Sequence, residues 1–290
     1  MKYGKVAPWL FVLPTVVGLS LFRLGPIAVA FLASFTKWNV ISSPQWLGLG
    51  NYAELLRSDT FWMILRNTVV FSLIYVPGVM ICGLFLAILV NNTLRGITFF
   101  RGLYYLPVIT STVAVGVVWS WILNPRFGAL PNFLLDIGLK NVPSFLGDGR
   151  WALFTLVVVY IWKMSGYHMI LFLAGLQNIP HMYYEAAQID GATRWHMLRH
   201  ITLPLLSSTT FFIGIIALIQ SLQSFDITMA MTEGGPNYAS ATLSFFTYIN
   251  AFVHFRMGYA AAMSFILFII VGTVTALNFV GRKHWVNVSY

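Results

Sequence analysis

The chain contains six apolar stretches that are each long enough to cross a lipid bilayer as a helix. The hydrocarbon core of a bilayer requires roughly 20 apolar residues of α-helix. Charged residues make up only 9% of the chain, compared with about 25% in soluble domains, and so few charges do not cover a soluble surface of this size. The sequence therefore predicts an all-α membrane protein. Its six predicted transmembrane helices lie at about 9–31, 67–90, 104–123, 152–176, 205–225 and 258–280.

All 290 residues are predicted to form a single transmembrane domain. No internal repeat, low-complexity tract or soluble segment interrupts the pattern, so function has to reside in the helices and their loops. The first apolar run is too long for the core of a signal peptide and is counted as a span. The single cysteine, Cys82, excludes an intrachain disulfide and a cysteine-rich metal site.

The basic residues predict that both termini face the cytoplasm. Six spans place the termini on the same side, and the inner segments then hold eight Lys and Arg residues, including Lys2, Lys5, Arg282 and Lys283. The outer loops, at about 32–66, 124–151 and 226–257, hold seven in a longer stretch of chain. The higher density inside follows the positive-inside rule. This bias also explains the net charge of +9, and the scattered basic residues argue against nucleic-acid binding.

The segment between the fourth and fifth spans, residues 177–204, carries the capping residues of two short helices. Glu185 lies near the start of the first, where a negative charge complements the helix dipole. Asp190 and Gly191 are typical of a helix end, and Thr193 can cap the start of a second helix. The pattern predicts a helix–turn–helix outside the membrane. It leaves two roles open: a docking element for a partner protein, or an amphipathic loop in the headgroup layer.

The order of residues in this segment resembles the EAA loop of permease subunits in ABC importers. The chain reads E-A-A from Glu185, D-G-A from Asp190 and I-T-L-P up to Pro204. In that family the loop forms a cytoplasmic coupling helix that docks into a cleft of the ATP-binding subunit. The resemblance therefore implies a coupling helix between spans four and five. The residues that match the family's docking surface are Glu185, Ala186, Ala187, Asp190 and Gly191.

Other segments, spread over nearly the whole chain, resemble binding-protein-dependent sugar permeases of the maltose and glycerol-phosphate type. They read W-L-G-L-G-N-Y at 46–52, N-P-R-F-G at 124–128, L-A-G-L-Q-N-I-P at 173–180 and E-G-G-P-N-Y at 233–238. The resemblance implies a multi-pass permease of the cell membrane, forming half of the pathway of an ATP-driven importer for a sugar or sugar derivative. It also implies three kinds of protein partner: a second homologous permease, two ATP-binding subunits and an extracytoplasmic solute-binding protein.

Polar and aromatic side chains follow one face of the fourth span and one face of the fifth. Tyr160, Lys163 and Tyr167 share a helical face, and Gln220 and Gln223 belong to a stripe on the fifth span. Aromatic planes, amides and hydroxyls bind sugars, but Ser and Gln also join helices by hydrogen bonds, and the pattern leaves both roles open. A cationic Lys163 would suit an acidic or phosphorylated ligand. The substrate-binding positions that the resemblance implies are Tyr160, Lys163, Met164, Tyr167, Ser221 and Ser224.

The sequence contains no motif for catalysis. A P-loop requires G-x-x-x-x-G-K-[ST], and none of the chain's lysines precedes Ser or Thr. We therefore predict a non-catalytic subunit that holds no metal or cofactor, with ATP and Mg bound by the partner subunits. The alternative is a proton- or ion-coupled secondary transporter that acts without ATPase subunits, a class that usually needs titratable residues within its spans. His168 in the fourth span is either such a residue, a metal ligand, or a neutral histidine hydrogen-bonded between helices.

Overall fold

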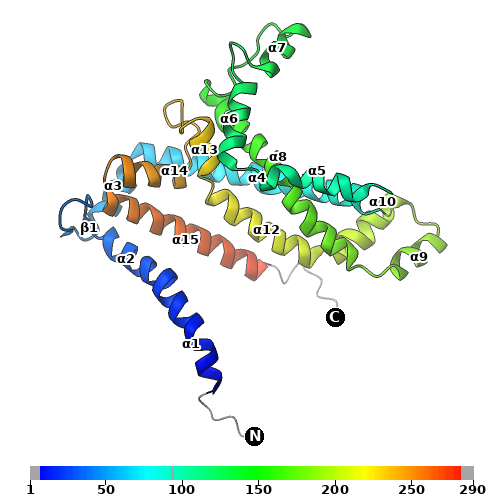
Figure 1. The fold of residues 1–290 in the computed structure, drawn as a ribbon, viewed down its shortest axis with the longest axis horizontal. Coiled ribbons are helices and arrows are strands. Elements are labelled where there is room, and N and C mark those ends of the chain that lie inside the picture. Colours follow the sequence, from blue (N-terminus) through cyan, green and yellow to red (C-terminus); the bar gives the residue numbers. More distant parts are fainter. Residues whose placement is uncertain (1–6, 93–94, 282–290) are drawn as a thin grey trace. The chain divides into compact units, whose positions relative to one another are not determined.

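The computed structural model describes residues 7–92 and 95–281, which are mostly helical (Figure 1). The basic residues Lys2, Lys5, Arg282 and Lys283, which enter the prediction of orientation, lie outside the described residues. The described part forms two compact units, and each is described by itself. Within the described residues, the first unit comes from the chain up to Phe61 and from Thr247–Ile269, and the second from Trp62–Phe246 and from the chain after Ile269.

Four continuous helical stretches in the described residues are long and apolar enough to cross a membrane. The first, Trp9–Ser34, joins α1 (Ala7–Leu19), the π-helical turn η1 (Ser20–Leu24) and α2 (Gly25–Ser34). The others are α4 (Asp59–Val90), α8 (Gly149–Gln177) and α15 (Met257–Gly281).

Two further spans are bent pairs of helices. The axis of α5 (Ile97–Ile109) makes an angle of 94° with α6 (Thr112–Ile122), and the stretch Arg194–Leu205 makes an angle of 68° with α12 (Ser207–Leu222). Counting each pair as one span gives the six predicted spans. The predicted span at 104–123 is interrupted, because Thr110 adopts an extended conformation after α5. The predicted span at 205–225 contains the unbroken helix α12, and the bend at Leu206 lies at its start.

The predicted outer loops contain more regular structure than their turn-forming residues indicate. The first holds the antiparallel strands β1 (Thr36–Lys37) and β2 (Gln45–Trp46), and α4 starts at Asp59, earlier than the predicted residue 67. The strands and the short helices of the outer loops are too short or too polar to be predicted as spans. The short helices in the outer loops are α3 (Gly50–Arg57), α7 (Ala129–Asp136), α13 (Asp226–Met231), α14 (Leu243–Tyr248) and the π-helical turn η3 (Ile249–Val253).

Helix α8 is the central helix of the second unit. Of the 18-residue apolar stretch that makes α8 long enough to cross a membrane, 56% is buried, compared with 28% of the corresponding stretch of α4. Small residues allow its neighbours to approach closely: the Gly83 backbone of α4 lies against His168, and Gly166 of α8 lies against the Tyr104 carbonyl of α5. A side chain at either glycine would meet protein atoms already in place, so these contacts fix how the helices pack.

We expect the substitution Gly166→Ala to destabilise the second unit. The added methyl group would overlap the Tyr104 carbonyl, which belongs to the backbone and cannot rotate away. Overpacking of this kind costs about 1–3 kcal/mol. The matched control is Gly102→Ala in α5, where an added Cβ has no protein atom within 4 Å. Thermal unfolding in detergent measures both variants, and equal midpoints would contradict the packing assigned to Gly166.

The first unit is held together around the end of α2. The Asn51 amide donates hydrogen bonds to the carbonyls of Ser34, at 2.8 Å, and Thr36, at 2.9 Å. The rings of Phe31 and Phe265 lie 5.0 Å apart and connect α2 with α15. Asn51 belongs to the segment 46–52, so this part of the motif has a structural role in joining α3 to the end of α2.

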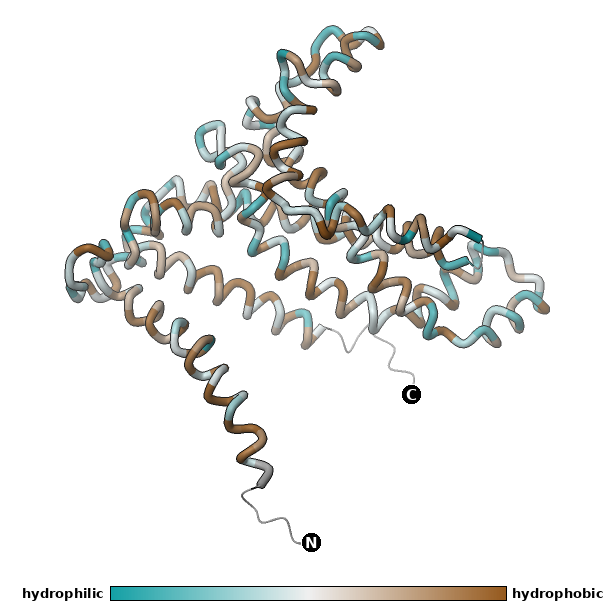
Figure 2. The backbone as a smooth tube through the Cα atoms, in the orientation of Figure 1, coloured by the Kyte–Doolittle hydropathy of each residue, from teal (hydrophilic) through white to brown (hydrophobic). Residues whose placement is uncertain are grey.

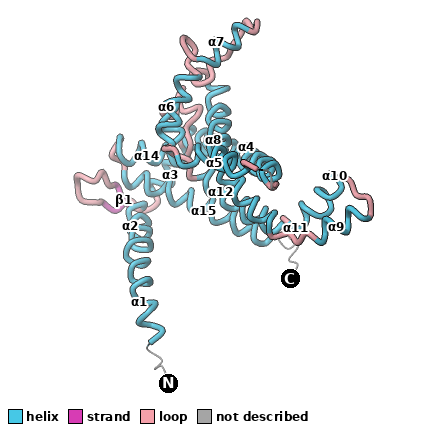
Figure 3. The backbone as a smooth tube through the Cα atoms, turned by 45° about the vertical axis from the view of Figure 1, so that its right-hand side comes forward, coloured by secondary structure: helices cyan, strands magenta, loops and turns pink. Residues whose placement is uncertain are grey.

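Different short helices flank the two ends of α8. Asp148 caps its start by accepting the Arg150 N–H at 2.9 Å, and the hydrogen bond from the Arg150 side chain lowers the pKa of the Asp148 carboxyl. Helix α7 precedes this end, and α9 (Met182–Ile189) and α10 (Arg194–Met197) follow the other end (Figure 3). A helix of 29 residues is about 43 Å long, which is enough to separate α7 from α9 and α10 by the width of a bilayer.

Hydropathy along the backbone follows this arrangement. Hydrophobic residues run along α1, α2 and α15, while hydrophilic residues gather in the segment that contains α9 and α10 (Figure 2). That segment continues through the π-helical turn η2 (Leu198–Thr202) and α11 (Leu203–Leu205) to α12. That residues 177–204 lie outside the hydrocarbon core stays a prediction.

Candidate functional site

The exposed helix α9 ends in a defined capping motif. Gly191 adopts the left-handed conformation, with φ of 77°. Its N–H donates to the Gln188 carbonyl at 3.0 Å, and the Ala192 N–H donates to the Ala187 carbonyl at 2.9 Å. This is the Schellman arrangement, which favours glycine at the left-handed position. The helix end at Asp190 and Gly191 therefore lies where the sequence predicts it.

The following turn also has the predicted cap. The Thr193 hydroxyl accepts the His196 N–H at 3.3 Å and caps α10. The half-buried Tyr184 of α9 forms a hydrogen bond between its hydroxyl and Thr202 Oγ1 at 3.0 Å, which joins α9 to η2. The segment is therefore an ordered helical hairpin.

The predicted docking surface is accessible. Glu185, Ala186, Asp190 and Gly191 are exposed, and Ala187 is half-buried. Large apolar side chains that the sequence analysis did not include lie in the same segment and are also exposed; exposed apolar patches of this kind mark protein or membrane contacts. Their position in an otherwise polar loop was the signal available in the sequence. They are Met182, Ile189 and Trp195, which are 66%, 87% and 68% exposed.

Within the spans, Tyr160 belongs to an aromatic and amide cluster. Its ring lies 4.9 Å from Tyr75 and 6.0 Å from Phe71, both on α4. The Tyr75 hydroxyl donates to Gln220 Oε1 on α12 at 3.2 Å. The polar faces predicted for the fourth and fifth spans thus meet through Tyr75 of the second span. Sequence analysis missed Tyr75, whose only signal is a hydroxyl in the middle of an apolar run.

The two predicted serines of the fifth span are both buried, but the Ser221 hydroxyl has a hydrogen-bond partner among the described residues and the Ser224 hydroxyl has none. The fully buried Ser221 hydroxyl donates to Ser72 Oγ at 2.9 Å, joining α12 to α4. Ser224 is buried after the end of α12, and its carbonyl accepts a hydrogen bond from Thr242 Oγ1 at 2.7 Å. The nearby Gln223 is exposed. Ser221 therefore makes the helix-joining contact that the sequence left open as its alternative role.

The remaining predicted residues of α8 lie apart from this cluster or on its edge. Met164 packs against the buried core around Leu156, while Tyr167 is half-buried and lies edge-on to the His168 ring at 5.4 Å. His168 is fully buried, and its Nδ1 is 3.0 Å from the Met164 carbonyl of the same helix. No group of three or more metal-ligating side chains occurs in residues 7–92 and 95–281.

Lys163 is buried, and its ammonium group contacts the break between α5 and α6. Nζ donates to the carbonyls of Pro107, Val108 and Thr110 at 3.2, 3.3 and 3.0 Å. Carbonyls at the end of a helix lack partners within the helix, and a cation there also complements the dipole. The three N–H groups of Lys163 thus match three backbone acceptors. Its predicted contact with substrate remains a prediction.

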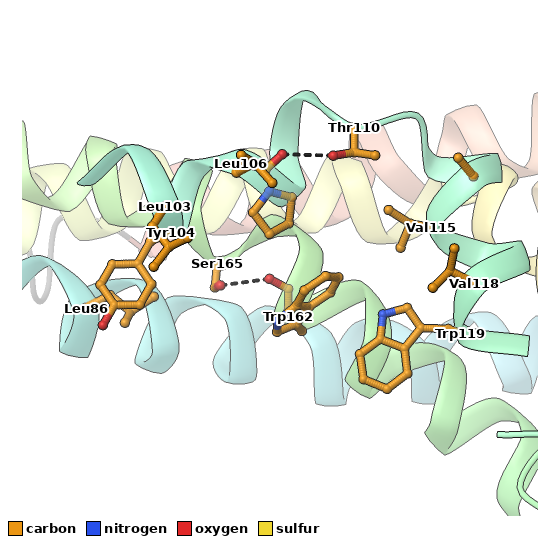
Figure 4. A pocket seen from close by; sticks show the side chains of 12 residues that line it. Leu86, Leu103, Tyr104, Leu106, Thr110, Val115, Val118, Trp119, Trp162 and Ser165 are labelled. Atoms are coloured by element: carbon orange, nitrogen blue, oxygen red, sulfur yellow. Dashed lines mark hydrogen bonds between the residues drawn. The ribbon is translucent and has the colours of Figure 1, made fainter. Parts of the chain in front are cut away.

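The break borders an apolar cavity of about 600 Å³ (Figure 4). The Trp119 and Trp162 rings line it edge to face, 5.4 Å apart. The hydroxyls of Thr110 and Ser165 donate to backbone carbonyls at 2.9 Å, so these two lining hydroxyls are already paired. On α8, Trp162 and Ser165 face away from Tyr160, because they are offset by about half a helical turn. The cavity and the Tyr160 cluster are therefore separate places.

Long and broken apolar helices, polar side chains buried between them, and an exposed helical hairpin at one end of the central helix together define a membrane transport subunit. The chain belongs to the family of binding-protein-dependent transport system inner membrane components, and the family model matches residues 79–283. It is accordingly a component of the inner membrane.

Curated relatives and a solved structure match over nearly the full chain. The lactose transport system permease protein LacF of Rhizobium radiobacter is 34% identical over 97% of this chain and 96% of that protein. The sn-glycerol-3-phosphate transport system permease protein UgpA of Agrobacterium fabrum is 33% identical over 95% and 94%. A bacterial alginate ABC transporter, solved in complex with an alginate pentasaccharide-bound periplasmic protein, contains a chain with a TM-score of 0.83 and 25% identity, covering 94% of this chain and 92% of that one.

Proposed function

We propose that this chain is the permease subunit of an ATP-driven importer for a saccharide or sugar derivative. The observation that carries the proposal is the exposed helix α9, which ends in a Schellman motif directly after the central span and bears the residues of the EAA loop. The relatives named for lactose and glycerol phosphate, and the neighbour solved with an alginate-loaded protein, support a hydroxylated substrate.

In this proposal α9 lies in the cytoplasm, as do both termini, and docks into an ATP-binding subunit. The docking surface of Glu185 to Ala187, Asp190 and Gly191 provides close backbone approach, because most of these side chains are small. Exposed Ile189 and Trp195 add apolar area that a cleft in the partner would bury. The ATP-binding subunits, two per transporter, bind ATP and Mg and perform hydrolysis, so this chain is non-catalytic.

The other partners complete the pathway. A second homologous permease forms the other half of the transmembrane passage, and an extracytoplasmic solute-binding protein delivers the substrate. The complex of the alginate transporter with a periplasmic protein supports delivery by such a binding protein. ATP and the loaded binding protein would shift the bundle between two conformations, because each binds one of them more tightly.

We propose the cluster of Tyr75, Tyr160 and Gln220 as the centre of the substrate site. It combines aromatic rings with an amide, and its Tyr75–Gln220 hydrogen bond holds the groups in place. The other predicted positions, Lys163, Met164, Tyr167, Ser221 and Ser224, would support this site.

Uptake by the assembled transporter in proteoliposomes tests the proposal. With the second permease, the ATP-binding subunits and the binding protein present, we expect uptake from a panel of radiolabelled disaccharides and phosphorylated polyols only when ATP is supplied. Tyr160→Phe is expected to raise KM several-fold, since one hydrogen bond is worth about 0.5–1.5 kcal/mol. Uptake by this chain alone, driven by a proton gradient, would instead establish the secondary transporter.

A further inference from the structure

The first unit contains a polar cavity of about 590 Å³ that none of the sites above includes. It lies between the β1–β2 hairpin, α3 and the start of α15, and we refer to it as the hairpin cavity. All its lining residues belong to the first unit. The residues that carry the following argument are Lys37, Trp38, Gln45, Glu54, Arg256 and Tyr259.

A fixed ion pair forms one wall of the hairpin cavity. Arg256 Nη2 lies 2.6 Å from both carboxylate oxygens of Glu54. The guanidinium also lies 4.1 Å above the ring centroid of Tyr259, which is itself only 5% exposed. The two charged side chains remain 43% and 51% exposed, so they can still reach a ligand. A carboxylate acceptor beside a guanidinium donor suits neighbouring hydroxyl groups, which both donate and accept hydrogen bonds.

Unoccupied hydrogen-bonding groups lie on the hairpin itself. The strand register pairs Lys37 directly with Gln45, which places their side chains on the same face. Neither side chain makes a hydrogen bond or ion pair with any residue in the described ranges 7–92 and 95–281. The half-buried indole of Trp38 lines the cavity next to them. The wall thus offers an ammonium, an amide and an aromatic ring.

The backbone beside the cavity adopts conformations that side chains other than glycine rarely adopt. Phe255 lines the cavity at φ of 53°, and Val40, one residue after the lining residue Asn39, has φ of 71°. Asn39 Oδ1 accepts hydrogen bonds from the N–H and the hydroxyl of Ser42, at 2.8 and 2.6 Å, which fixes the turn. Such strain persists where the surrounding structure enforces it, and it is concentrated at ligand sites.

We propose that the hairpin cavity binds one unit of a saccharide. Glu54, Arg256, Lys37 and Gln45 would bind hydroxyls, and Trp38 would cover the C–H face of the sugar ring. A simple anion fits less well, because Glu54 neutralises Arg256 and would repel a phosphate or carboxylate. The inference rests on the proposed function for the saccharide chemistry and for the outer location of segments 32–66 and 226–257. It assigns a second site, at the entrance, separate from the Tyr160 cluster.

Saturation-transfer NMR on the assembled complex in nanodiscs, without ATP and without the binding protein, tests the site. The probes are maltopentaose and inorganic phosphate. We expect saccharide signals from the unsubstituted complex and at least tenfold weaker binding in Glu54→Gln and Lys37→Met, because hydrogen bonds to charged groups are worth about 1.5–3 kcal/mol. Lys37 is exposed, so its variant keeps the test valid even if Glu54→Gln does not fold. Lys140→Met, exposed in the second unit, is the matched control and should bind normally.

Unchanged saccharide binding in both variants, or binding of phosphate without saccharide, would overturn the assignment. The outcome is separable from that of the proposed function. ATP-driven uptake without saccharide binding at the hairpin cavity removes this inference alone. Variant-sensitive saccharide binding without ATP-driven uptake upholds the site and removes the importer.

Discussion

Gly191→Trp is expected to abolish ATP-driven uptake while the chain still folds and inserts. Gly191 is exposed, and a Cβ at this position has no protein atom within 4 Å, so the large side chain would not clash internally. A left-handed conformation costs a non-glycine residue about 1–2 kcal/mol, which a folded span tolerates. The indole would instead stand between α9 and its partner. Co-purification of the ATP-binding subunit and uptake in proteoliposomes measure the effect, and both should fall by tenfold or more.

The chain provides a closely matched control at Gly138, after α7. Its N–H donates to Leu135 and the next N–H donates to Leu134, at 3.0 and 3.1 Å, which repeats the Schellman motif of α9. Its φ is 95°, and a Cβ there also has no protein atom within 4 Å. Gly138→Trp therefore carries the same local strain at the opposite end of α8. If both variants lose uptake equally, or if Gly191→Trp imports normally, the docking assignment is wrong.

Lys163→Met is expected to destabilise the second unit through the break between α5 and α6. The variant preserves much of the side-chain volume but leaves the carbonyls of Pro107, Val108 and Thr110 without their donor. Each buried group left unsatisfied costs about 1–3 kcal/mol, and lipid provides no water to replace the bond. Thermal unfolding in detergent should show a lower midpoint than for the control Lys140→Met, since Lys140 is exposed.

The same variant separates two roles for Lys163. If its ammonium stabilises the break between α5 and α6, the unfolding midpoint of Lys163→Met falls. Lys163→Arg then restores part of the stability, because the guanidinium can also donate to several carbonyls. If the ammonium instead binds substrate, Lys163→Met raises KM for an acidic or phosphorylated sugar and leaves the unfolding midpoint unchanged. That second result would contradict the structural role assigned here.

The features predicted well from sequence depend on local rules. The spans follow from apolar length, and α9 follows from capping residues whose partners lie within a few positions, such as Gly191 with Gln188. Local rules therefore suffice to place the helical hairpin of α9 and α10 after the central span. Thr193 belongs to the same group, because its hydroxyl bonds an N–H three residues ahead.

The features that sequence analysis missed depend on contacts between distant residues. Lys163 meets carbonyls 53 to 56 positions away, and Tyr75 meets Gln220 at a separation of 145. Apolar length treats the third span as one continuous helix, because it does not register the extended conformation of Thr110. The hairpin cavity was missed for a similar reason: Glu54 and Arg256 are 202 residues apart.

The bend between α5 and α6 limits how this span can move. Only Thr110 and Ser111 separate the two helices, so any change in their angle is confined to a few backbone torsions. The ammonium of Lys163 contacts carbonyls of α5 and of Thr110 together, so it holds the end of α5 and the first residue of the connector against α8. A gating motion that displaced α8 would therefore carry the end of α5 and Thr110 with it, and any change in the angle between α5 and α6 would fall on the backbone torsions around Ser111.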